Sequence, residues 1–167
     1  MKKSIPTTQT QATIDRVLAL LAGTPDRLDS LSRGLPEDEL RRPFAPGERS
    51  FAAVVAHLIN TEARSNEAIV LALTLREPLR PKIHAERDYG RLLRHDLMLV
   101  ADMLAYARFR RTALLRVLRG LAPEQWARVV REEGKARRES VYWLARALAL
   151  HEEEHLMELQ GKIGARF

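Results

Sequence analysis

Four long segments of the chain repeat apolar residues at steps of three and four positions, and strand-type alternation of apolar and polar residues is largely missing. This spacing places the apolar side chains on one face of a helix, which has to be covered in the folded protein. The pattern predicts long helices over residues 10–33, 51–76, 91–119 and 140–163. Four such helices indicate an all-α fold, a four-helix bundle with a long crossover between the second and third helices.

Capping and breaking residues refine these boundaries. Ser50 is placed to cap the second helix. Thr24 followed by Pro25 has the form of a helix start, so we expect a kink or a restart within the first segment. Residues 78–90 are expected to form a loop, and a small hairpin is expected around Gly134.

The chain length of 167 residues fits one domain. We expect residues 1–9 to be a flexible N-terminus and residues 10–167 to form the single domain. The N-terminus lacks the apolar run of a signal peptide. Charged residues interrupt every stretch that approaches the roughly 18 apolar residues of a membrane span. These features favour a cytoplasmic protein that has no membrane partner.

The chain is basic, with a formal net charge of +6 that invites a nucleic-acid hypothesis. Five arginines lie close together in the second half of the third predicted helix: Arg108, Arg110, Arg111, Arg116 and Arg119. They fall on more than one side of that helix, leucines interleave with them, and no aromatic stacking platform accompanies them. A solvated helix surface is therefore the favoured interpretation, and a nucleic-acid-associated protein is kept as an alternative.

The absence of cysteine changes which chemistry is available. The chain can form no disulfide, and it has no thiolate to act as a nucleophile or metal ligand. Any metal ion must be bound by histidine, carboxylate or backbone oxygen. The five histidines are therefore the main candidates for a functional site.

Three of these histidines are predicted to point into the bundle. His151 and His155 are four residues apart in the apolar stripe of the last helix, and His57 lies in the apolar stripe of the second. An unsatisfied buried polar group costs about 1–3 kcal/mol, so three buried imidazoles are hard to explain by packing alone. A divalent cation would satisfy all three. His84 and His95 are expected to be exposed bystanders, with His95 the better candidate to reach a pocket.

Residues 151–155 also match the H-E-x-x-H pattern of zinc peptidases, in which the first glutamate acts as the general base. Those enzymes usually place a third ligand well downstream. Only about a dozen residues follow His155, and none is a histidine. The third ligand must lie upstream, with His57 as the candidate, so the peptidase interpretation is disfavoured.

The chain resembles the DinB-like superfamily of metal-binding four-helix bundles over about residues 11–161. The resemblance rests on motifs that occur in order: Thr24-Pro25-Asp26-Arg27-Leu28, Arg42-Pro43 through Gly47-Glu48-Arg49-Ser50, Val55-Ala56-His57-Leu58 with Glu62, Leu121-Ala122-Pro123-Glu124-Gln125-Trp126, and His151-Glu152-Glu153-Glu154-His155-Leu156. The chain departs from the family pattern at Arg49, where a tryptophan is common, and at Glu158, where a glutamine is frequent. Arg49 would change the packing at the helix start or place a cation near the pocket.

The resemblance implies that His57, His151 and His155 bind one divalent metal ion, with Ni²⁺ or Zn²⁺ favoured and Fe²⁺ or Mn²⁺ as alternatives. It also implies a homodimer. In some branches of the family a small thiol, such as bacillithiol or mycothiol, is activated at the metal and transferred to an electrophile. A non-catalytic, stress-associated metal-binding bundle is the main alternative. Glu62, five residues after His57, is expected either to assist a ligating histidine or act as a base, or to be a solvated residue.

Overall fold

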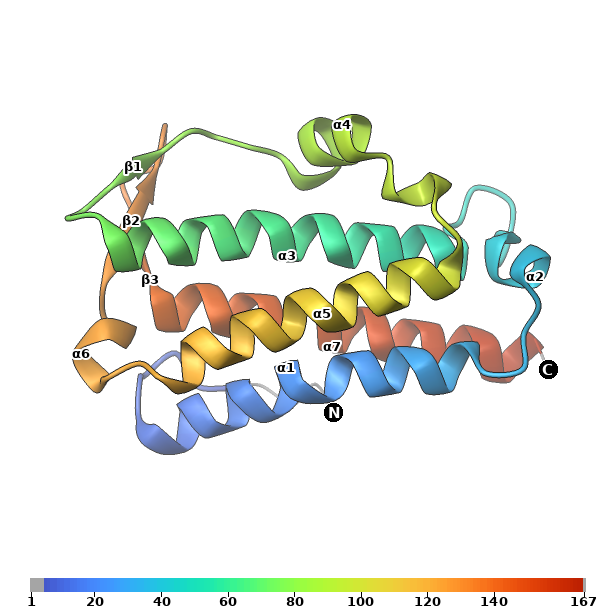
Figure 1. The fold of residues 1–167 in the computed structure, drawn as a ribbon, viewed down its shortest axis with the longest axis horizontal. Helices are drawn as coiled ribbons and strands as arrows, with labels where there is room; N and C mark the ends of the chain where they lie inside the picture. Colours follow the sequence, from blue (N-terminus) through green and yellow to red (C-terminus); the bar gives the residue numbers. More distant parts are fainter. Residues whose placement is uncertain (1–4, 167) are drawn as a thin grey trace.

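The computed structural model describes residues 5–166 and confirms the predicted four-helix bundle (Figure 1). Its long helices are α1 (Gln11–Ser32), α3 (Phe51–Thr74), α5 (Val100–Arg119) and α7 (Val141–Arg166). Helices α1 and α3 each pack against both α5 and α7. Two short helices, α2 (Glu37–Arg41) and α6 (Pro123–Trp126), lie in the connections at opposite ends of the bundle.

The crossover between α3 and α5 is longer than the sequence predicts. It contains a π-helical turn η1 (Ala85–Gly90), the single turn α4 (Arg91–Leu93) and the 3₁₀ turn η2 (His95–Leu97). The prediction of a continuous helix from residue 91 is wrong, because Arg94 adopts a left-handed backbone conformation with φ 48° and ends α4. The long helix begins only at Val100, so η1 and α4 are free to lie along α3.

A small sheet ties the start of the crossover to the end of the bundle. Its strands are β1 (Leu79–Arg80), β2 (Val129–Glu132) and β3 (Arg138–Ser140), in the order β1-β2-β3. Strands β2 and β3 form the hairpin predicted around Gly134, which has φ 78°. Strand β1, which pairs in parallel with β2, was not predicted because only two residues form it. Buried Arg80 pairs with buried Glu132, which fixes the crossover at this end.

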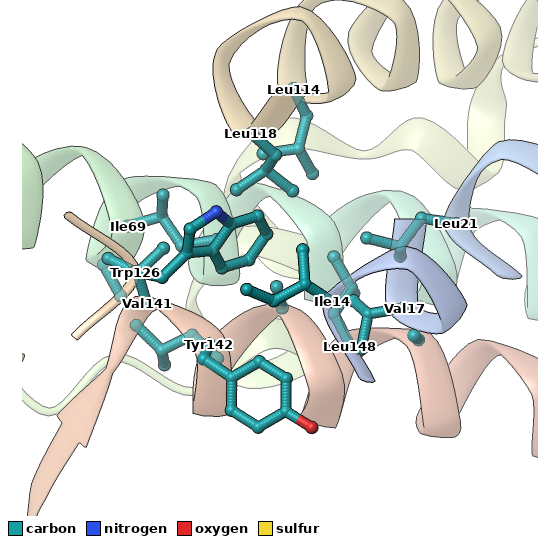
Figure 2. Packing of buried hydrophobic residues seen from close by; sticks show 14 of the residues in the cluster. Ile14, Val17, Leu21, Ile69, Leu114, Leu118, Trp126, Val141, Tyr142 and Leu148 are labelled. Carbon is teal, nitrogen blue, oxygen red and sulfur yellow. The ribbon is translucent and has the colours of Figure 1, made fainter. Parts of the chain in front are cut away.

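The apolar core at the end of the bundle near α6 is built from all four long helices. Figure 2 shows the packing of Ile14, Val17, Leu21, Ile69, Leu114, Leu118, Trp126, Val141, Tyr142 and Leu148. The segment 1–9, which the sequence predicts to be flexible, is described from residue 5 onward, and residues 1–4 lie outside the described part. The Ile5 side chain is fully buried in this core, and the Tyr142 hydroxyl donates to the Pro6 carbonyl over 2.7 Å.

A second apolar cluster fills the bundle near α2, and a polar layer separates it from the first. Each long helix contributes one buried side chain to this polar layer: Thr24 from α1, Glu62 from α3, Arg111 from α5 and Glu152 from α7. The Arg111 guanidinium donates to Glu62 over 2.9 Å and to Glu152 over 2.9 Å. The Thr24 hydroxyl donates to Glu152 over 2.9 Å. Arg111 is therefore a buried core residue, and the prediction that places it on a solvated surface is wrong.

The polar layer also explains why α1 continues through Pro25. A proline has no N–H, so the carbonyl four residues earlier, that of Leu21, loses its usual helical donor. The Arg111 guanidinium donates to this carbonyl over 2.7 Å. Because the orphaned acceptor is satisfied, α1 runs unbroken from Gln11 to Ser32, and the expected restart is absent.

Candidate metal centre

The histidines predicted to point inward meet between α3 and α7. His57 lies in the second turn of α3, which begins where the Ser50 hydroxyl accepts from the Ala53 N–H over 3.1 Å. His151 and His155 lie one turn apart on α7. One nitrogen from each of the three imidazoles lies within 4.8 Å of the other two. The spacing in the sequence therefore identified a cluster that the fold assembles.

The nitrogen positions suit a shared cation. Nε2 of His57 and Nε2 of His151 are 3.2 Å apart. Two nitrogens at about 2.0–2.1 Å from one tetrahedral ion would be separated by about 3.3 Å. The Nδ1 atoms of His151 and His155 are buried and form no hydrogen bond within the described part of the chain. Buried nitrogens without a hydrogen bond on two of the three half-buried imidazoles fit a metal site better than they fit an apolar core.

Glu86 orients His57 from the crossover. Its Oε1 atom accepts a hydrogen bond from His57 Nδ1 over 2.7 Å. Because a carboxylate only accepts, Nδ1 carries the proton, and Nε2 of the neutral ring keeps its lone pair for a metal. Carboxylates in this position fix the tautomer of a ligating histidine and raise its basicity.

The environment keeps two of the histidines neutral. Burial, reinforced by His155 and His57, lowers the pKa of His151 to about 4. Burial also lowers the pKa of His57, against the opposing effect of Glu86. Positive Arg49 adds to the lowering at both rings. A neutral imidazole is the form that binds a metal ion.

Glu62 does not assist a ligating histidine, which was one of the roles expected of it. Its carboxylate faces Arg111 in the polar layer and does not bind a histidine, whereas Glu86 holds His57. Glu152, the general base that the peptidase motif would require, is also fully buried against Arg111 and Thr24. Both glutamates accept hydrogen bonds from Arg111, so neither carboxylate is available to the imidazole cluster.

The other two histidines have separate roles. His95 is buried, contrary to expectation, and its Nδ1 lies 2.9 Å from Oδ1 of Asn60 on α3. This contact helps to hold the crossover against α3. His84 is exposed, as expected, and accepts from the Arg87 N–H at the start of η1. Glu158 is half exposed, and its carboxylate approaches His155 Nδ1 to 3.4 Å.

Replacing Glu86 by glutamine is expected to weaken metal binding about 10- to 100-fold, because the neutral amide is a poorer acceptor for His57 Nδ1. The dissociation constant for zinc, measured by competition with a chelating dye, checks this. Asp102→Asn is the matched control, since it removes an exposed carboxylate on α5 instead. Equal affinities in Glu86→Gln and the wild type would show that Glu86 does not tune the site.

The metal-free protein is expected to lose stability as the pH falls from about 6.5 to about 4. The unfolded chain takes up a proton at His151 near its ordinary pKa of 6.5, whereas the folded chain resists protonation down to about 4. Urea unfolding at pH 7 and pH 5 in the presence of a chelator measures the change. The His151→Gln variant should show a smaller decrease, and parallel curves for the two proteins would contradict this assignment.

No helix among residues 5–166 is both long and apolar enough to cross a membrane.

Comparisons with known proteins agree with this architecture. The chain resembles the solved structure of YfiT from Bacillus subtilis, described as a probable metal-dependent hydrolase with an unusual four-helix bundle topology. The match has a TM-score of 0.83 and 17% sequence identity, and it covers 98% of this chain and 94% of YfiT. No curated protein matches the sequence. The family model of the DinB superfamily matches residues 9–159, and the chain therefore belongs to the DinB superfamily.

Proposed function

We propose that this protein is a metal-dependent enzyme that binds one divalent cation through His57, His151 and His155 and activates a small nucleophile there. The observation that carries the proposal is the cluster of three imidazole nitrogens within 4.8 Å, of which one ring is oriented by a carboxylate. Histidine ligands suit zinc and nickel, which we propose as the resident ions, and they also accommodate iron or manganese.

The proposed nucleophile is a low-molecular-weight thiol that is transferred to an electrophile, as in the thiol-dependent branches of the family. A divalent cation at such a site supplies Lewis acidity, which lowers the pKa of a thiol or water. The chain has no cysteine, so the sulfur must arrive with the substrate. The protein's own contribution is to keep the imidazoles of His57 and His151 neutral and to hold the proton of His57 on Nδ1.

Hydrolysis, with water as the nucleophile, is the second candidate. It is favoured by the structural match to YfiT, which is described as a probable metal-dependent hydrolase. Because that match has 17% identity, it bears on the fold, and the reaction has to be tested directly.

The decisive assay uses the protein loaded with zinc or nickel. Small thiols are supplied with 1-chloro-2,4-dinitrobenzene in one arm, and activated esters are supplied without thiol in the other. We expect metal-dependent thiol conjugation that disappears in His151→Ala. Ester hydrolysis alone would favour the hydrolase. A protein that binds metal tightly but catalyses neither reaction would match the non-catalytic bundle.

The nucleic-acid alternative loses part of its basic surface in the folded protein. Arg108 pairs with Asp26 over 2.8 Å and also with Asp29, while Arg111 is buried. This alternative requires nucleic-acid binding whose affinity falls steeply as the salt concentration rises and which persists when the histidine cluster is removed.

We also propose a homodimer, because large apolar side chains remain exposed on the crossover and α5. Leu92 is 78% exposed and Phe109 is 75% exposed. Association with a second copy would remove these apolar side chains from water, which favours a dimer. Light scattering gives the mass in solution, and a monomer at all concentrations would contradict the proposal.

A further inference from the structure

A cavity of about 350 Å³ lies beside the histidine cluster, between the start of α3 and the crossover. Glu86 connects the two sites, since it lines the cavity and also accepts the hydrogen bond from His57 Nδ1. The lining also includes three residues with small side chains or none: Ala53, Ala56 and Gly90. This volume falls at the lower end of the roughly 300–1,000 Å³ that is typical of small-molecule pockets.

The cavity carries unbalanced positive charge. Three arginines line it: Arg49, Arg91 and Arg94. Arg94 is paired with Asp96 over 3.0 Å, and Glu86 is engaged by His57. The side chains of Arg49 and Arg91 have no ion pair or hydrogen bond with any other residue in the described part of the chain. The lining therefore holds three guanidiniums against the two carboxylates of Glu86 and Asp96, and neither carboxylate is paired with the exposed guanidinium of Arg49 or of Arg91.

The amide group of Asn60, which also lines the cavity, already contacts other residues of the protein. Asn60 presents Oδ1 to His95 over 2.9 Å, and its Nδ2 lies 3.5 Å from Glu86. Gly90 approaches Asn60 so closely that an added Cβ would lie 3.2 Å from Nδ2, which keeps this amide confined. The donors left for a ligand are the guanidiniums, which bind carboxylate and phosphate oxygens in pairs.

We propose that this cavity binds an anionic group of the substrate, a carboxylate or a phosphate, through Arg49 and Arg91. The inference deepens the proposed function, on which it rests for the identity of the neighbouring reactive centre. An anion bound here places the rest of a small molecule beside the histidine cluster and discriminates against neutral or cationic analogues. Arg49, where the family commonly has tryptophan, thereby becomes a specificity residue of this chain.

Calorimetric titration of the zinc-loaded protein tests the proposal with four probes: mercaptosuccinate, succinate, inorganic phosphate and the neutral thiol 2-mercaptoethanol. We expect mercaptosuccinate to bind about tenfold more tightly than 2-mercaptoethanol, since charge-assisted hydrogen bonds to arginine exceed neutral ones. The Arg49→Gln, Arg91→Gln double variant should lose this preference. Binding of 2-mercaptoethanol, which carries no anionic group for the guanidiniums, should change far less than binding of mercaptosuccinate. A comparison of succinate with phosphate shows which anion fits better.

The control is Arg116→Gln, which removes another exposed arginine, from the last turn of α5, near the end of the bundle that carries α6. It should behave like the wild type. An unchanged preference for mercaptosuccinate in the double variant, or the absence of any preference in the wild type, would overturn the proposal.

Failure of the proposed function gives a different result. The His155→Ala variant, which leaves Glu86 and both arginines in place, should still bind succinate or phosphate in an arginine-dependent manner while losing zinc. If the wild type takes up no zinc, the proposed function fails, and the same titrations still decide whether Arg49 and Arg91 bind anions. Succinate binding that disappears with zinc would place the anion on the metal and contradict the arginine site.

Discussion

Substitution of His57 by alanine is expected to weaken zinc binding by at least about 100-fold, with loss of all metal-dependent activity. The change removes one of three imidazoles whose nitrogens lie within 4.8 Å, and it removes the ring that Glu86 orients. The two histidines that remain lie on a single helix, α7, and cannot enclose an ion from two sides. Metal content after purification without chelator, together with the dissociation constant, measures the effect.

The matched control is His84→Asn, because His84 is exposed, lies outside the cluster and caps η1 with an acceptor that asparagine can replace. This variant should retain the metal stoichiometry of the wild type. Circular dichroism separates loss of the site from loss of the fold, since His57 is only partly buried and its replacement should leave the bundle intact. If the folded His57→Ala variant binds zinc as tightly as the wild type, His57 is not a ligand of the metal.

Replacement of Arg111 by methionine is expected to lower the free energy of unfolding by about 3–5 kcal/mol. The methionine side chain fits the volume of the arginine stem, but it carries no charge and donates no hydrogen bond. Glu62 and Glu152 are then buried without their shared cation, and the Leu21 carbonyl has lost its donor. Burial raises the pKa of Glu152 despite the opposing effect of Arg111, which shows how costly its charged form is in the core. Urea unfolding at pH 7 measures the loss.

The triple variant that adds Glu62→Gln and Glu152→Gln to Arg111→Met should recover part of this stability. The most costly consequence of the single change is the unpaired buried charge, and neutral amides relieve it. Arg116→Met serves as the surface control and should change stability by only about 0.5 kcal/mol. A single Arg111→Met variant as stable as Arg116→Met would show that the polar layer does not hold the four helices together.

Periodicity predicted the bundle and its histidine cluster because both depend on the same local rule. His151 and His155 are one turn apart within an apolar stripe, and His57 occupies the corresponding stripe of α3, so the apolar pattern that buries the helices also points the imidazoles inward. The order of the helices and the long crossover followed from the spacing of these segments. The exact start of α5 did not, because it depends on the left-handed conformation of Arg94.

The partners of the histidines could not be predicted in the same way. Glu86 reaches His57 from 29 residues away, through a π-helical turn in a crossover that has no regular repeat. Glu62 was a plausible partner because of its position on the same helix, but Arg111 across the bundle determines where its carboxylate points. Arginine is usually exposed, so a sequence alone gives no reason to place Arg111 in a core. The one local hint was Pro25, whose missing N–H demanded an outside donor.

X-ray absorption spectroscopy of the purified wild-type protein, at the edge of its bound metal, tests whether three imidazoles hold one divalent ion. We expect one metal per chain with a first coordination shell of nitrogen and oxygen, the outer-shell signature of three histidines, and no sulfur when thiols are absent from the buffer. A protein that binds no stoichiometric metal, or a metal with fewer than two histidine ligands, would contradict this expectation.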